Sequence, residues 1–150
     1  GGRLQAAQPV NVATVLRVLV DEMTMDDPKR IELVLADAPV FSDIDADAFA
    51  ILARNLIENA LKHGSRHEPV RVALSADGVL RVFNAGSAVP ADMLARLAEP
   101  FERGGAQGEG AGLGLAIAKA IASGIGGRIE LVSPREGRQD GFEARFIPGK

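Results

Sequence analysis

Glycine is concentrated in one short stretch of this chain. Of the 17 glycines in 150 residues, nine lie within residues 104–127. Glycine costs about 1 kcal/mol relative to alanine inside a helix, yet apolar residues recur with helical spacing from Leu113 to Ile121 within this stretch. A flexible linker would precede the helix rather than overlap it. The pattern therefore predicts a loop that runs into a helix over 113–123, whose N-terminus exposes backbone N–H groups to an anion.

Two well-known phosphate loops do not fit the stretch. A P-loop needs Gly-Lys followed by Ser or Thr, and the only Gly-Lys is Gly149-Lys150 at the chain end. The dinucleotide fingerprint needs a preceding strand and a third glycine at the position of Leu115. Both sites are excluded, which leaves a helix N-terminus reached through a glycine-rich loop.

The rest of the chain mixes helices with hairpins. Asn11 is placed to cap a helix over 12–25, and Asp45 a second helix that stops at Gly64. Asp77-Gly78 favours a tight hairpin turn. Strands are predicted over 31–36 with 40–41, 70–74, 79–83, 128–132 and 142–146. This order predicts one domain over 3–150 with an α+β fold, an α/β sandwich. One mixed, mainly antiparallel sheet would pack against three helices on one face.

Composition removes several function classes. Seventeen Lys and Arg against 20 Asp and Glu give a net charge of -3, without the basic run that nucleic-acid binding favours. The chain has no cysteine, which excludes disulfides, thiol catalysis and Cys-ligated zinc. No apolar run approaches the roughly 20 residues that span a bilayer, so we expect no direct membrane contact by this domain.

The predicted second helix carries an unusual polar arc. At about 100° per residue, Asn55, Glu58, Asn59 and Lys62 fall on one side of the helix. Asparagine is a mediocre helix former, so two of them at i, i+4 suggest a use for their carbonyl oxygens. Such oxygens suit Mg²⁺, which takes few protein ligands and completes its shell with water and phosphates. An ordinary solvated face is the alternative.

Four motifs in order resemble the ATP-binding catalytic domain of sensor histidine kinases, in the wider group that includes gyrase B and Hsp90. Asn55 to Gly64 is similar to the N box of that family, and Asn84 to Pro90 to its G1 box. Glu99 to Arg103 is similar to the F box, and Gly110 to Leu115 to the G2 box. The resemblance implies ATP and Mg²⁺ as cofactors and a flexible ATP lid between residues 86 and 113.

The resemblance also implies site residues. Asn59, helped by Asn55, would hold Mg²⁺, Lys62 would supply a charge to the phosphates, Arg103 would reach the γ-phosphate, and Glu58 would orient a group nearby. Gly86 would let the backbone approach the adenine. The remaining nucleotide contacts implied are His63, Asn84 and Val89, with Gly110, Gly112, Leu113, Gly114 and Leu115 in the lid and helix start.

Two positions depart from the family pattern. Asn84 stands where the family usually has an Asp that accepts from the adenine amino group, and Ala88 replaces a usual glycine. An amide oxygen still accepts, but it loses charge assistance worth about 1 kcal/mol. The substitutions predict weaker nucleotide binding and a less strict preference for ATP.

The reaction class follows from another position. Asn55 stands where ATP-hydrolysing relatives have a water-activating Glu, which favours transfer to a better nucleophile such as a histidine. His63 and His67 lie at the end of the same predicted helix and not in the helical hairpin of the family's acceptor. As an i, i+4 pair they lack a third metal ligand. The acceptor histidine is therefore expected on a separate dimerisation domain, absent from this chain.

The resemblance further implies a response regulator receiver domain as a partner, and a cytoplasmic location for this domain of a parent protein in the bacterial inner membrane. Two alternatives stay open. One is a nucleotide-binding pseudokinase that regulates a partner, because Asn84 and Ala88 depart from the pattern. The other is a serine kinase of the anti-sigma factor type, which is complete at about this length.

Overall fold

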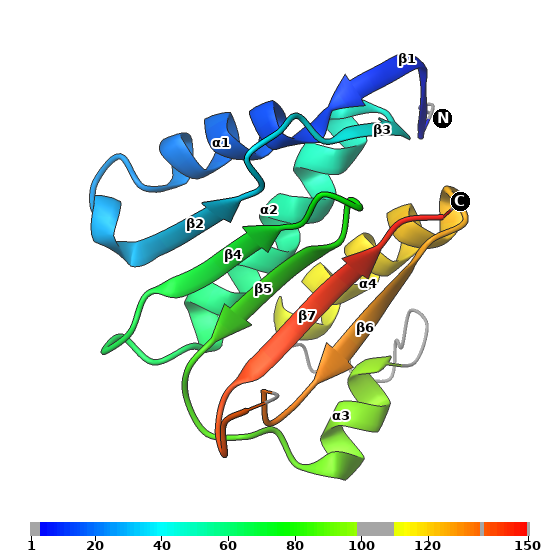
Figure 1. Cartoon of the computed structure of the whole chain (residues 1–150). Helices are drawn as coiled ribbons and strands as arrows, with labels where there is room; N and C mark the ends of the chain where they lie inside the picture. Colours follow the sequence, from blue (N-terminus) through cyan, green and yellow to red (C-terminus); the bar gives the residue numbers. More distant parts are fainter. Residues whose placement is uncertain (1–3, 99–109, 136, 150) are drawn as a thin grey trace.

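A computed structural model describes residues 4–98, 110–135 and 137–149, with backbone alone for 110–114. Helices are interspersed with pairs of consecutive strands along the chain (Figure 1). Their bounds are β1 Gln5–Asn11, α1 Val12–Met23, a 3₁₀ turn Pro28–Arg30, β2 Ile31–Leu35, β3 Phe41–Ile44, α2 Ala46–His63, β4 Val70–Leu74, β5 Leu80–Asn84, α3 Ala91–Ala98, α4 Gly110–Gly124, β6 Arg128–Val132 and β7 Phe142–Ile147.

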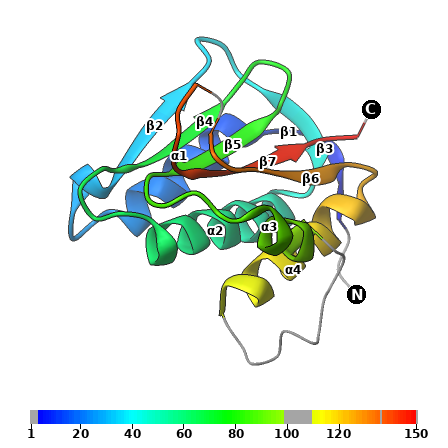
Figure 2. The same cartoon turned by 90° about the horizontal axis from the view of Figure 1, so that it is seen from below.

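The strands form two sheets. The larger has five strands in the order β2-β4-β5-β7-β6, with β2 parallel to β4 and every other pair antiparallel. A separate antiparallel pair joins β1 and β3. Figure 2 shows α2, α3 and α4 on one side of the larger sheet. The predicted α+β sandwich with a mixed, mainly antiparallel sheet is confirmed, with one helix more than expected.

Strand alternation decides what faces the helices. Val82 pairs with Val72 on one side and Ala144 on the other, and all three side chains are buried under the helices. Asn84 lies two residues beyond Val82 on the same strand, so its side chain also points to the helix side. Phe83, between them, points to the opposite face.

Both predicted helix caps are present. The Asn11 side chain accepts from the backbone N–H of Ala13 and from that of Val40, each at 3.2 Å. Asp45 accepts from Ala48 N at 3.0 Å at the start of α2. A side-chain cap contributes about 1 kcal/mol to helix stability. The apolar face of α2 then lies in the core, where it includes Phe49, Leu52, Leu56 and Ile57.

Among the described elements, β1, α3 and the short 3₁₀ turn Pro28–Arg30 were not predicted. β1 reads Gln-Ala-Ala-Gln-Pro-Val-Asn, without alternating apolar residues, and forms through its pairing with β3. α3 is only eight residues long and begins directly after Pro90, in a segment predicted as loop. The helix that follows the glycines begins at Gly110 rather than at 113, so it starts inside the glycine pattern as expected.

Candidate functional site

The ends of α2 and β5 meet at Gly64. Its N–H donates to Ala60 O at 2.8 Å and closes the helix. A Cβ at this position would stand 2.6 Å from Ala60 O and 2.7 Å from the Cβ of Asn84, so only glycine fits. The next residue, Ser65, donates its N–H to Ala85 O at 2.8 Å. The end of β5 is thereby held against the end of α2.

Two carboxamide oxygens at this junction are buried without a partner. Among the side chains that the structure describes, Asn59 Oδ1 and Asn84 Oδ1 are the buried polar atoms that accept no hydrogen bond. Asn84 is 5% exposed, and its Nδ2 donates to Ala85 O at 3.2 Å, which leaves the oxygen as its remaining polar atom. An unsatisfied buried acceptor costs about 1–3 kcal/mol. Both asparagines are therefore maintained at a cost in stability, as ligand-binding groups are.

The predicted polar arc of α2 is present. Asn59 stands at its border with the buried face, at intermediate exposure. Asn55 donates Nδ2 back to Ile51 O at 2.7 Å, which directs its oxygen away from that carbonyl. Glu58 is exposed and pairs with Arg54 at 3.7 Å.

Lys62 and His63 are exposed in the last turn of α2. The α2–β5 junction lies at that turn, so a ligand bound at the junction would have the Lys62 ammonium and the His63 imidazole beside it. Asn59 lies about one turn from both, because each residue advances the helix by about 1.5 Å.

These groups fit Mg²⁺ held mainly by a phosphate ligand. Among the described residues, no group of three or more His, Cys, Asp or Glu side chains could hold a metal ion by itself. A single buried, unpartnered carboxamide oxygen at Asn59 suits an ion that takes one or two protein oxygens and completes its octahedron with water and substrate phosphates. The orphaned Asn84 oxygen suits a ligand N–H donor.

The segment after β5, residues 85–89, continues from the α2–β5 junction and borders the candidate site. Gly86 has φ +132°, which other residues rarely adopt. Its C=O accepts from Gly141 N at 2.7 Å, and Val89 donates its N–H to Ser133 Oγ, also at 2.7 Å. The pKa of Asp140 is lowered, chiefly by hydrogen bonds from Arg138 and also by the backbone N–H of Gly86.

Sequence reasoning missed these contacts from Ser133, Asp140 and Gly141. They come from the connection between β6 and β7, more than 40 residues along the chain from Val89. No local spacing marks them, so only the pairing of β5 with β7 reveals that the two segments are neighbours.

The glycine-rich helix start lies next to α2, because α4 packs along α2 (Figure 1). Gly110, Gly112, Leu113 and Gly114 fall in the first two turns of α4. Backbone N–H groups in the first turn of a helix have no helical partner, and those of Gly110 and Gly112 belong to this turn. Leu115 is 1% exposed and its side chain belongs to the core. Arg103 and the Glu99–Arg103 motif lie outside the described residues.

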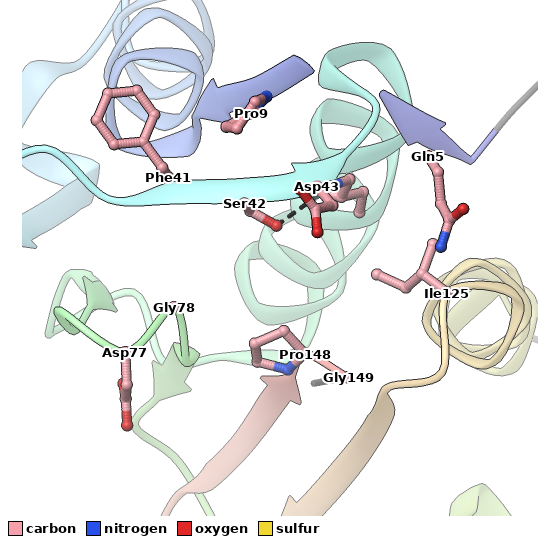
Figure 3. A pocket seen from close by; sticks show the side chains of 11 residues that line it. Gln5, Pro9, Phe41, Ser42, Asp43, Asp77, Gly78, Ile125, Pro148 and Gly149 are labelled. Atoms are coloured by element: carbon pink, nitrogen blue, oxygen red, sulfur yellow. Dashed lines mark hydrogen bonds between the residues drawn. The ribbon is translucent and has the colours of Figure 1, made fainter. Parts of the chain in front are cut away.

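A groove elsewhere shares no residue with this junction. It lies near both chain termini and is lined by residues of β1, β3 and the β4–β5 turn, including Phe41, Asp43 and Asp77 (Figure 3). Asp77 is engaged in its own turn, where Ser75 Oγ and Val79 N donate to its carboxylate and the pKa of Asp77 is lowered as a result. The junction stands at the opposite end of β5.

No helix within the described ranges is both long and apolar enough to cross a membrane.

Known proteins resemble the chain over most of its length. The family model described as histidine kinase-, DNA gyrase B- and HSP90-like ATPase matches residues 44–148. A bacteriophytochrome of Pseudomonas aeruginosa is 35% identical over 128 residues, which cover 81% of this chain and 18% of that protein. The signal transduction histidine-protein kinase AfsQ2 of Streptomyces coelicolor is 34% identical over 134 residues, 85% of this chain and 24% of the relative.

Two solved structures share the fold. The cytoplasmic segment of histidine kinase QseC matches with a TM-score of 0.69 and 21% identity, over 95% of this chain and 74% of that one. The catalytic domain of histidine kinase ThkA matches with a TM-score of 0.70 and 22% identity, over 94% of each chain. The resemblance drawn from the four motifs is confirmed: the relatives and structures that the chain resembles include histidine kinases, and the chain belongs to the histidine kinase-, DNA gyrase B- and HSP90-like ATPase family.

Proposed function

We propose that this domain binds Mg-ATP at the α2–β5 junction and transfers the γ-phosphoryl group to a histidine on a separate dimerisation domain. The observation that carries the proposal is the pair of buried, unpartnered oxygens at Asn59 and Asn84. One is a ligand suited to a magnesium ion, and the other is an acceptor suited to an amino group on a base.

Each residue has a role that its position supports. Asn59 Oδ1, with Asn55, would hold the ion, and Mg²⁺ when bound neutralises phosphate charge. Lys62 and His63 are exposed at the last turn of α2, and both would contact the same phosphates. The start of α4, with Gly112, Leu113 and Gly114 in its first two turns, would bind the triphosphate through its unpartnered backbone N–H groups, that of Gly112 among them. Three further residues would lie near the phosphates. Glu58 would orient a group there, Arg103 would reach the γ-phosphate, and Gly110 would contact the nucleotide through its backbone.

The base side is formed by β5 and the segment after it. The Asn84 amide nitrogen is bonded to Ala85 O, so its oxygen is the atom left to accept from the adenine amino group. Gly86 lets the backbone approach the ring plane, and Val89, at intermediate exposure, would border it. Asn84 thus retains the acceptor role that an aspartate has in the family, without its charge.

The proposed transfer rests on the residue at position 55. Asn55 has no carboxylate to accept a proton from water, so a neutral imidazole nitrogen is the favoured nucleophile. That nitrogen forms a bond to the γ-phosphorus while the bond to the leaving oxygen of ADP breaks. The domain itself supplies positioning and charge stabilisation and forms no covalent intermediate.

The relatives support the proposed partners and location. The chain spans less than a quarter of the length of the two relatives described above. The phosphorylated histidine would pass its group to the aspartate of a response regulator. The parent protein would lie in the bacterial inner membrane, with this domain on the cytoplasmic side.

Calorimetry tests the binding step. Mg-ATP is titrated into the wild type, Asn59→Ala and, as a matched control, Asn11→Ala, with a parallel titration of ATP without magnesium. We expect Asn59→Ala to lose the magnesium-dependent part of the affinity and Asn11→Ala to keep it. Unchanged affinity in Asn59→Ala would mean that the metal ligand is misassigned.

Labelled ATP tests the transfer step. The domain is mixed with a dimerisation domain that carries the acceptor histidine, and the label on that domain is followed over time. Appearance of the label on the dimerisation domain would support the proposed kinase activity. Nucleotide binding without transfer would instead favour a regulatory pseudokinase, which the departures at Asn84 and Ala88 would explain.

A further inference from the structure

The β6–β7 connection, described at residues 133–135 and 137–141, is hydrogen-bonded to the segment that follows β5. Ser133 Oγ accepts from Val89 N at 2.7 Å and donates to Gly141 O at 2.6 Å. Gly141 N in turn donates to Gly86 O at 2.7 Å. We call these three hydrogen bonds the Ser133 bridge. One hydroxyl thus joins two chain segments that are 44 residues apart.

The connection is itself anchored to the face of the sheet that the helices leave open. The guanidinium groups of Arg135 and Arg138 lie over the Phe83 ring, 4.5 and 5.2 Å from its centroid. Arg135 pairs with the buried carboxylate of Glu143 at 3.2 Å, and Arg138 pairs with Glu68 at 3.1 Å. Stacked and paired arginines hold a loop in one geometry. The connection that carries the Ser133 bridge therefore also contacts Phe83 and Glu143 of the sheet.

The bridge completes the support of one wall of the site. On the α2 side, residues 85–89 are fixed by the bond from Ser65 N to Ala85 O. On the other side, they are fixed by the bridge. A segment held on both sides keeps its backbone groups in place before a ligand arrives, so less conformational freedom is lost on binding.

We propose that Ser133 is a positioning residue for the nucleotide base. Its hydroxyl holds the Gly86–Val89 backbone in the binding geometry and does not touch the nucleotide. The inference rests on the proposed function, because it names how the base-binding wall of that same site is pre-organised. It predicts a contribution to affinity from a residue that belongs to none of the four motifs.

The test compares nucleotide binding in matched variants. Mg-ATP and Mg-ADP are titrated by calorimetry into the wild type, Ser133→Ala, Ser133→Thr and Ser75→Ala. The last is the control, since Ser75 Oγ also has two partners, Asp77 and Val79 O, in the distant β4–β5 turn. Melting temperatures are measured for all four proteins.

We expect Ser133→Ala to bind both nucleotides about tenfold more weakly, as the loss of one to two net hydrogen bonds gives. The loss should be equal for ATP and ADP because the effect lies on the base side. Threonine keeps the hydroxyl and should restore affinity, and Ser75→Ala should bind like the wild type. Should Ser133→Ala unfold, Ser133→Cys gives the same test, because a thiol is a weak donor and acceptor.

The possible outcomes distinguish a failure of the Ser133 positioning role from a failure of the proposed function. Wild-type affinity in Ser133→Ala overturns the positioning role and leaves the proposed function standing. An equal loss in Ser75→Ala also overturns it, because the effect would then be general destabilisation. A wild type that binds neither nucleotide overturns the proposed function, and this inference with it.

Discussion

Replacing Asn59 by leucine should stabilise the protein while removing its function. Asn59 Oδ1 is buried without a hydrogen-bond partner, and an unsatisfied acceptor of this kind costs about 1–3 kcal/mol. Leucine has the same number of side-chain heavy atoms with the same branching, removes the orphaned oxygen and is the better helix former by a few tenths of a kcal/mol. We expect a net gain of about 1 kcal/mol, or about 2–4 °C in Tm for a domain of this size.

The same substitution at Asn11 should have the opposite sign. Asn11 Oδ1 accepts two backbone N–H bonds, from Ala13 and from Val40. Leucine would remove the helix cap, worth about 1 kcal/mol, and leave a second donor unpaired at about 1 kcal/mol more. Asn11→Leu should therefore lose about 2 kcal/mol, or roughly 4–8 °C.

Thermal unfolding by circular dichroism without nucleotide, with calorimetric titration of Mg-ATP, measures both effects. Asn59→Leu should melt higher and lose magnesium-dependent binding, and Asn11→Leu should melt lower and keep binding. A lower Tm in Asn59→Leu would refute the reasoning, because the oxygen would then be satisfied in the free protein. Retained binding would refute its role as a ligand.

Two further variants test the junction and its electrostatics. Gly64→Ala should lose about 1–3 kcal/mol by overpacking and bind ATP more weakly, since the new Cβ would displace Asn84; denaturant unfolding and calorimetry measure the two losses. Hydrogen bonds from Arg138 lower the pKa of Asp140 in the folded protein below its ordinary value of 3.8. The ionised Asp140 carboxylate therefore contributes to the free energy of unfolding above pH 3.8, and this contribution is lost as the pH falls through the folded pKa. The wild type should therefore exceed Asp140→Asn in urea midpoint at pH 7 by more than at pH 3, and a constant gap would contradict this assignment.

Local signals predicted most of the fold. The α2 helix was predicted to begin at its Asp45 cap and stop at Gly64, and both boundaries are confirmed. The hairpin of β4 and β5 was predicted from alternating apolar residues around Asp77-Gly78. In each case the residues that determine the structure lie within a few positions of one another, so the sequence alone contains the determinants.

Nonlocal pairing explains what was missed. β1 contains Pro9 and little apolar alternation, and it is a strand because β3 lies beside it. The Ser133 bridge joins segments that meet only once the five-stranded sheet has formed. At the site itself, helical periodicity alone placed Asn55 and Asn59 on one arc. Asn84 was assigned only through the family resemblance, because its burial against Gly64 depends on tertiary contact.

The strand order also has a consequence for solubility. β2 and β6 form the two edges of the five-stranded sheet as far as the structure describes it. β6 carries an ion pair between Arg128 and Glu130 and lies beside α3, while β2 carries the exposed Glu32. Charged or covered edges resist the addition of a strand from another molecule. Copies of this domain crowded together can therefore stay separate instead of aggregating through their backbones.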